Sequence, residues 1–471
     1  DVETKWLDIP GDASQNYLVR MEYIPNTNKL LIQQLNRKQN NSKLYIADAF
    51  NGSAKMIYEE SDEAWVDLFQ QGNTYAIDYT NSFDFLEETN SILWASEKDG
   101  WRHLYQVSLE GKLEILITKG DYDVIDLKFI DSKNGYVYYL ASPDNATQKY
   151  LYKSKLNGNG KQKLLSPESL KGSHDYYFSS NGKYAIHTFT NHYTPRLKEL
   201  IKVKTMDKKS NVEFFTITTA DNVEMDGWMV KPTNFDPGKK YPVVFYVYSE
   251  PAGTTVRDVY NVSRNRWYIG NMAEDGYIYI SLDNRGTPAP KGREWRKSIY
   301  RKIGEININD QAMAAKEILK WDFVDPDRIA VWGHSGGGSA TLNLMFRYHE
   351  IYKTGISLAA VANQLTYDNI YQERYMGLPQ ENMEDFINGS PITYAKNLEG
   401  NLLYIHGTGD DNVHYQNADL LINELIKHNK QFQFMPYPNR SHSFREGEGT
   451  YKHMSTLYTN FLKENCPPGG R

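Results

Sequence analysis

The sequence predicts two parts of different class, an all-β part followed by an α/β part with a mainly parallel, doubly wound sheet. In the first 205 residues short strands alternate with turns centred on glycine, which is typical of antiparallel hairpins. From about residue 212, near-continuous apolar strands alternate with helical stretches, a rhythm that favours a parallel sheet covered on both faces. A stretch at 206–211 separates these rhythms, so we place the two parts at 1–205 and 206–471.

The all-β part repeats one short unit, a strand with a Leu-Tyr pair, a turn containing Gly and a further strand. The pairs lie at 44–45, 104–105 and 151–152, and another strand precedes each, at 29–34, 91–96 and 135–140. A four-stranded unit that recurs every ~40–50 residues is typical of a β-propeller blade. We therefore expect three to four blades, with an irregular β-sandwich as the alternative. Because a propeller closes with about four to eight blades, we also expect an incomplete ring or first blades upstream of Asp1.

The α/β part has a regular alternation of strands and helices. The predicted strands are 212–219, 225–231, 242–248, 277–282, 328–333, 355–360, 401–406 and 431–437, and the clearest helices are 310–320, 339–349 and 416–428. In an open parallel sheet, ligands bind at the carboxyl ends of the strands. We therefore look for functional side chains directly after these strands.

Composition narrows the class of protein. The net charge is −6, so no basic excess indicates nucleic acid as a partner. No apolar run approaches the ~20 residues that span a bilayer. The 36 Tyr residues favour a large β component. The one cysteine, Cys466, excludes an internal disulfide and a zinc cluster built from cysteines, and we expect it in a disordered C-terminal tail.

The strongest local motif is Gly333-His334-Ser335-Gly336-Gly337. A predicted strand runs directly into this G-x-S-x-G pattern and a predicted helix follows it, which is the context of a nucleophile elbow. The glycines allow the tight turn, and the helix N-terminus favours developing negative charge. The motif therefore predicts an α/β-hydrolase domain with Ser335 as the nucleophile.

A serine nucleophile needs a base that a carboxylate orients. In an α/β-hydrolase the acid and then the histidine follow the serine along the chain. Asp410 and Asp411 come after the strand at 401–406, and His442 comes after the strand at 431–437. We predict Asp410 as the acid, with Asp411 as the alternative, and His442 as the base.

The remaining histidines are weaker candidates for the base. His334 should point away from the serine beside it, and His406 should be a structural hydrogen-bonding residue. A metal hydrolase is the competing interpretation, since His406, Asp410, Asp411 and His414 are close in sequence. Their spacing matches no common zinc motif, so we expect neither a metal nor another cofactor.

Together these residues resemble the dipeptidyl peptidase IV branch of the prolyl oligopeptidase family, in a bacterial form. The likeness is strongest at Asp283-Asn-Arg-Gly286, Gly333–Gly337, Tyr371-Gln-Glu-Arg-Tyr-Met-Gly-Leu-Pro379 and His406-Gly-Thr-Gly-Asp-Asp-Asn-Val-His414, and a blade segment is similar at Asp99-Gly-Trp-Arg-His-Leu-Tyr105. The resemblance implies a serine exopeptidase that releases N-terminal X-Pro or X-Ala dipeptides. It also implies a homodimer and a periplasmic or secreted location.

The resemblance also implies roles for individual residues. Tyr248 and the N–H of Gly336 correspond to the oxyanion hole, and Asn412 corresponds to the amide that holds a substrate carbonyl. The walls of the pocket for the residue before the scissile bond correspond to Val361, Gln364, Tyr367, Tyr371 and Val413. Family members with tight proline selectivity commonly carry an aromatic residue after the serine and a Trp in this wall. Gly336 and Gln364 stand there instead, so we expect a more open pocket that also accepts Ala or larger residues.

A pair of glutamates that grips the free amino terminus of the substrate is the family feature that we do not find. Glu59-Glu60 and Glu87-Glu88 are acidic pairs, but we interpret both as solvated loop residues and expect the grip upstream. An acylaminoacyl peptidase or oligopeptidase of the same fold is therefore an alternative. A peptide-binding protein without catalytic activity is a further alternative, although the nucleophile, acid and base are all present.

Overall fold

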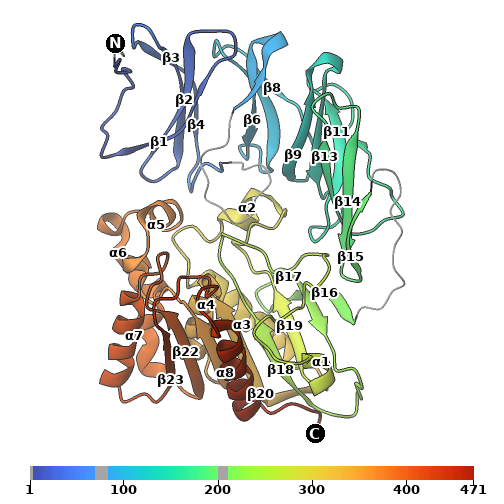
Figure 1. Ribbon diagram of the computed structural model, residues 1–471, viewed down its shortest axis with the longest axis vertical. Helices are drawn as coiled ribbons and strands as arrows, with labels where there is room; N and C mark the ends of the chain where they lie inside the picture. Colours follow the sequence, from blue (N-terminus) through green and yellow to red (C-terminus); the bar gives the residue numbers. More distant parts are fainter. Residues whose placement is uncertain (1–3, 69–82, 200–210) are drawn as a thin grey trace.

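The all-β part forms a row of small antiparallel sheets. The computed structural model describes residues 4–68, 83–199 and 211–471. Within them this part contains four sheets, three of four strands and one of three, which stand side by side above the α/β part (Figure 1). The strands are β1 (Asn16–Tyr23), β2 (Lys29–Asn36), β3 (Asn41–Asp48), β4 (Ala54–Ser61), β5 (Asp84–Leu86), β6 (Ser91–Ser96), β7 (His103–Ser108), β8 (Glu114–Leu116), β9 (Val124–Asp131), β10 (Tyr136–Ala141), β11 (Tyr150–Lys155), β12 (Lys163–Leu164), β13 (Ser173–Phe178), β14 (Ala185–Asn191) and β15 (Thr194–Glu199).

The Leu-Tyr pairs lie on β3, β7 and β11, and both members of each pair are buried. Because successive side chains on a strand point to opposite faces, burial of both members means that each of these sheets is covered on its two faces. Stacked, covered sheets are the arrangement of propeller blades.

Glu60 departs from its prediction as a solvated loop residue. It lies on β4, and its carboxylate accepts hydrogen bonds from Trp94 Nε1 at 2.7 Å and Ser96 Oγ at 2.6 Å on the neighbouring blade. Glu59 is also on β4, but its side chain is exposed. Alternation along the strand places one glutamate between two blades and the other in solvent. Glu87 and Glu88 begin a short 3₁₀ helix, Glu87–Thr89, and are exposed as expected.

The α/β part is built on one eight-stranded sheet with the order β16-β17-β19-β18-β20-β21-β22-β23. Strand β17 pairs antiparallel with β16 and β19, and the pairs from β19 to β23 are parallel. This is the predicted α/β-hydrolase fold. The bounds are β16 (Val212–Thr218), β17 (Glu224–Val230), β18 (Tyr241–Tyr246), β19 (Ile278–Leu282), β20 (Val324–His334), β21 (Thr354–Leu358), β22 (Asn401–Gly407) and β23 (Gln433–Tyr437). The boundary predicted at 206 lies outside the described residues.

Two hydrophobic cores cover the two faces of this sheet. On β20, Ile329 and Val331 contribute to one core, and Ala330 and Trp332 contribute to the other. The first core includes α3 (Ile306–Ile318), α4 (Gly336–Arg347) and α7 (Gln416–Lys427), and the second includes α1 (Met272–Asp275) and α8 (Thr450–Asn465). Helices α5 (Asn369–Tyr375) and α6 (Pro379–Gly389) follow β21 and lie towards the blades (Figure 1).

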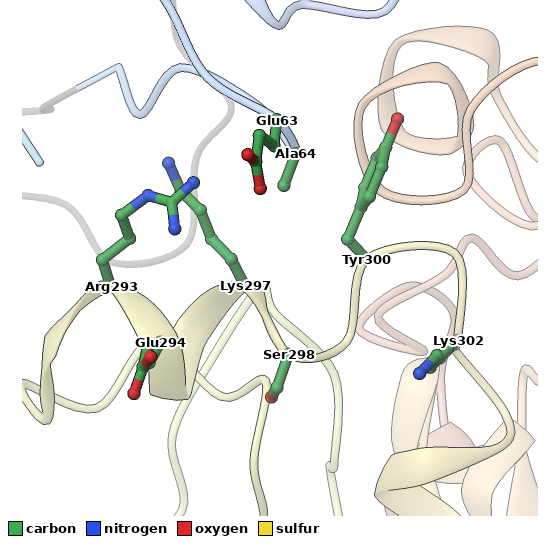
Figure 2. A pocket seen from close by; sticks show the side chains of 8 residues that line it. All are labelled: Glu63, Ala64, Arg293, Glu294, Lys297, Ser298, Tyr300 and Lys302. Atoms are coloured by element: carbon green, nitrogen blue, oxygen red, sulfur yellow. The ribbon is translucent and has the colours of Figure 1, made fainter. Parts of the chain in front are cut away.

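A short helix, α2 (Gly292–Lys297), joins the two parts through buried ion pairs. Arg296 bonds to Glu97 and, at 2.5 Å, to Asp123, and Lys297 lies 3.0 Å from Glu97. All four side chains are buried. Figure 2 shows Arg293 and Lys297 pointing from α2 towards the propeller segment that carries Glu63. The contact fixes α2 against the first three blades.

The C-terminal tail is packed against the sheet domain, so the expectation of a disordered tail is wrong. Cys466 caps α8 and is fully buried, and its carbonyl accepts a hydrogen bond from Tyr277 Oη at 2.7 Å. Arg328 donates to the carbonyls of Pro467 and Gly469, and Arg471 pairs with Asp325 at 2.6 Å. Contacts with distant residues order this polar segment.

Candidate active site

Ser335 lies on a strained turn between β20 and α4. Its φ of 60° and ψ of −122° are rare for a residue with a side chain. The turn brings the backbone very close to the end of β18, because an added Cβ would lie 2.6 Å from Val247 O at Gly333 and 2.2 Å from it at Gly337. Only glycine fits at both positions. The predicted elbow therefore forms at the carboxyl end of the central strands.

The three predicted side chains meet at this edge of the sheet. His442 Nε2 lies 2.8 Å from Ser335 Oγ, and His442 Nδ1 lies 2.8 Å from Asp410 Oδ2. Asp410 follows β22 and His442 follows β23, in the order that the sequence predicts. Asp411, the alternative acid, is exposed. The row of hydrogen bonds can pass a proton from the serine to the imidazole while the carboxylate holds the ring.

Asp410 is held as an anion by its surroundings. Its Oδ1 accepts the backbone N–H groups of Asn412 at 3.0 Å and Val413 at 2.8 Å. Burial alone would raise its pKa, but hydrogen bonds from His406, His442 and the Val413 N–H outweigh burial and hold the pKa well below the usual range. His406 is fully buried and also bonds to Val413 O at 2.9 Å. His406, the predicted structural histidine, therefore stabilises the loop that carries Asp410.

His334 does not point away from the site altogether. Its Nε2 lies 2.8 Å from the carbonyl oxygen of His442, and the two rings are 4.8 Å apart. Burial lowers the pKa of His334 to about 3, so the ring is neutral and donates its N–H to that carbonyl. His334 thus contacts the loop of the base through the backbone.

Tyrosines gather beside the nucleophile. Tyr371 packs edge to face on Tyr367 with the ring centroids 5.3 Å apart, and Tyr367 Oη donates to Asn412 Oδ1 at 2.9 Å. Tyr248, half-buried two residues beyond β18, lies close enough to help raise the pKa of Tyr371, after burial and Glu250. Tyr248, Tyr367, Tyr371 and Asn412 therefore form one group at the strand ends.

The other predicted pocket residues are fixed by backbone or neighbouring contacts. The N–H of Val361 donates to Ser339 Oγ in the first turn of α4 at 2.9 Å, and Val413 lies in the acid loop. Gln364 is buried in a 3₁₀ helix, Gln364–Thr366, and accepts a hydrogen bond from Gln372 of α5 at 2.6 Å. All three are buried near the edge that carries Ser335.

Sequence reasoning missed Glu250. This residue is buried, and its Oε2 accepts a hydrogen bond from Tyr371 Oη at 2.7 Å. A Cβ added to Gly336 would lie 2.6 Å from Glu250 Cδ, so the carboxyl group fills the space beside the residue after the nucleophile. Burial raises the pKa of Glu250 to about 7. A carboxylate two residues after the apolar strand predicted at 242–248 was the available signal.

Within residues 4–68, 83–199 and 211–471, His, Cys, Asp and Glu side chains form no group of three that could hold a metal ion. In the same part of the chain, no helix is long and apolar enough to cross a membrane.

Comparisons with known proteins match both parts of the chain. Residues 263–467 match the prolyl oligopeptidase family, and residues 1–196 match the dipeptidyl peptidase IV N-terminal region. The chain is 31% identical to dipeptidyl peptidase 4 of Trichophyton rubrum over 416 residues, which are 83% of this chain and 52% of that protein. It is 28% identical to the "Probable dipeptidyl peptidase 4" of Emericella nidulans over 96% of this chain and 61% of that protein.

A solved structure is similar across both parts. The crystal structure of Porphyromonas gingivalis dipeptidyl peptidase 4 superposes with a TM-score of 0.87 at 31% identity, covering 98% of this chain and 65% of that one. The chain thus spans between about half and two thirds of the length of these relatives.

Proposed function

The chain belongs to the dipeptidyl peptidase IV branch of the prolyl oligopeptidase family, and from this premise we propose that it is a serine exopeptidase that releases N-terminal X-Pro or X-Ala dipeptides. The observation that carries the proposal is the unbroken row of hydrogen bonds from Ser335 through His442 to Asp410, with 2.8 Å at each step. The strained backbone of Ser335 supports it further, because strain of this kind presents a nucleophile.

In the proposed reaction Ser335 Oγ attacks the substrate carbonyl while His442 Nε2 takes its proton. Asp410 stabilises the imidazolium that forms, and the Gly336 N–H and Tyr248 hydroxyl receive the negative charge on the oxygen. His442 then gives the proton to the leaving amine, which departs and leaves an acyl-enzyme. Water, activated by the same histidine, hydrolyses the ester and restores the serine.

The pocket for the residue before the scissile bond is proposed to lie among the tyrosines beside Ser335. Tyr367, Tyr371, Val361 and Val413 offer aromatic and apolar surface, which suits proline or alanine. Asn412, whose Oδ1 accepts a hydrogen bond from Tyr367, is proposed to donate its amide N–H to a substrate carbonyl. Substrates are proposed to be peptides with a free amino terminus.

The test is kcat/KM on chromogenic peptides, each as the free and the acetylated form, with X-Pro, X-Ala and X-Leu before the cleaved bond. Ser335→Ala is the control for contaminating activity. Cleavage of free X-Pro and X-Ala that the variant lacks supports the proposal. Cleavage of acetylated peptides alone favours an acylaminoacyl peptidase or oligopeptidase. If Ser335 does not react with a fluorophosphonate, the chain is a peptide-binding protein instead.

A further inference from the structure

Glu250 places an acidic group directly against the nucleophile elbow. It lies two residues after Tyr248, and its carboxyl carbon occupies the space that a side chain at position 336 would fill. The same carboxyl group accepts a hydrogen bond from Tyr371, which packs edge to face on Tyr367. It therefore lies among the residues proposed to form the pocket, on the side nearest Ser335.

This carboxyl group is buried and only partly satisfied. A carboxylate offers two oxygens with about four acceptor sites. Tyr371 Oη is the one hydrogen-bond partner that the described residues give it, and no cation among them lies close enough to shift its pKa. Buried carboxylates are costly without partners, so such a group is expected to meet a donor when the site is occupied.

The donor must come from a short side chain. Glu250 Cδ lies 2.6 Å from the position where a side chain at Gly336 would carry its Cβ, so the carboxyl group is beside the residue that follows the attacking serine. A hydroxyl on the β- or γ-carbon of the substrate residue can reach this position, whereas a long side chain such as lysine must extend past it. The neighbouring walls present the aromatic rings of Tyr367 and Tyr371.

We propose that Glu250 accepts a hydrogen bond from the hydroxyl group of the substrate residue whose carbonyl Ser335 attacks. On this basis the enzyme prefers Thr, Ser or 4-hydroxyproline at that position over Val, Ala or Pro of nearly the same shape. The inference rests on the proposed peptidase function and specifies its substrates. A site built to pair with a hydroxyl discriminates strongly against an analogue that lacks it, because its own polar group then stays unpaired.

The experiment measures kcat/KM for three matched pairs of free dipeptide substrates, X-Thr and X-Val, X-Ser and X-Ala, and X-4-hydroxyproline and X-Pro. The full chain is compared with Glu250→Leu, which keeps volume and removes the acceptor, and Glu250→Gln, which keeps shape and removes charge. Glu274→Gln, at an exposed glutamate on α1, is the matched control. In the wild type and the control, we expect kcat/KM to be about ten- to a hundredfold higher for the hydroxyl member of each pair.

In Glu250→Leu the preference should vanish or reverse, and in Glu250→Gln it should shrink because a charge-assisted bond is lost. Equal rates within the wild-type pairs, or a preference that survives Glu250→Leu, overturn the inference while leaving the peptidase function standing. If Glu250→Leu does not fold, the wild-type ratios and Glu250→Gln decide alone. Absence of cleavage of every peptide by the wild type overturns both the function and the inference.

Discussion

His334 Nε2 donates a hydrogen bond to the backbone carbonyl of His442 at 2.8 Å, although the two residues are 108 positions apart. The bond joins the strand that carries the nucleophile to the loop that carries the base. Because burial keeps His334 neutral, with a pKa of about 3, the ring supplies its N–H at any pH at which the peptidase would work. His334 is therefore a positioning residue for His442.

We expect His334→Phe, which keeps an aromatic ring and removes the N–H, to lower kcat by about five- to tenfold, the cost of one neutral hydrogen bond. KM should change little, because the substrate does not contact this group. His334→Gln, whose amide can donate to the same carbonyl, should recover part of the loss. His349→Phe, at a surface histidine paired with Glu399, is the control. Equal kcat for His334→Phe and this control contradicts the role.

Asp410 and its neighbour Asp411 allow a matched comparison. Asp410→Asn keeps the shape but can no longer stabilise the imidazolium, so kcat should fall by about 10⁴-fold, as in other triads. Asp411→Asn changes an exposed side chain and should leave kcat within about twofold. Steady-state kinetics on one X-Pro or X-Ala peptide decide between them. A large loss in Asp411→Asn instead would assign the acid to the other residue.

Gly336 and Glu250 compete for the same space. Gly336→Ala adds a Cβ that meets Glu250 Cδ at 2.6 Å, so the variant should lose about 1–3 kcal/mol by overpacking. Glu250→Ala removes the obstacle, and the double variant should be more stable than the sum of the single changes predicts. Gly338→Ala is the control, since its Cβ meets the backbone oxygen of Leu358 at 2.5 Å and Glu250→Ala should not relieve it. Thermal unfolding of the three single variants, and of the two double variants that combine Glu250→Ala with each glycine change, measures the coupling.

The meeting of Ser335, Asp410 and His442 was predictable because the signals for these residues are local. Ser335 sits in a glycine motif between a strand and a helix, and Asp410 and His442 each follow a recognisable strand. The order of nucleophile, acid and base along the chain in this fold then predicts that the three side chains meet, which no single segment indicates by itself. The two parts were predictable for a similar reason, because periodicity reports secondary structure over each short stretch.

Contacts between distant segments explain what the sequence could not predict. Glu250 and Tyr371 are 121 positions apart, and the sequence around either residue does not indicate that the two are in contact. The sequence predicts Glu60 in a solvated loop, yet it lies on β4 and donors on the adjacent blade bind its carboxylate. Cys466 lies in a segment rich in Pro and Gly, yet Tyr277 and Arg328 hold the tail in place.

Glu250 should also make stability depend on pH. Its pKa is raised by burial from 4.5 to about 7, so between these values the folded protein keeps a proton that the unfolded chain has released. The unfolding free energy therefore falls as the pH rises from about 4.5 to about 7 and is flat above, with a total near 3 kcal/mol. Glu250→Gln has no carboxyl group to titrate at this position, so this fall in the unfolding free energy is absent from the variant. The Tm of Glu250→Gln minus that of the wild type should therefore increase between pH 5 and pH 8, and a constant difference contradicts the burial of a free carboxyl.

Arg296 should be the strongest electrostatic link between the two parts of the chain. Arg296→Met leaves Glu97 and Asp123 buried with fewer partners, and breaking one side of a buried pair costs about 3–5 kcal/mol. The Tm should fall by about 3–5 °C for a chain of this size. Lys463→Met is the control, because its pair with Asp275 is 41% and 31% exposed and is worth about 1 kcal/mol or less. Adding Glu97→Gln and Asp123→Asn to Arg296→Met should recover part of the Tm, since the unpaired charges are then gone. If Arg296→Met and Lys463→Met have the same Tm, the hydrophobic contacts around α2, rather than its ion pairs, hold the blades on the sheet domain.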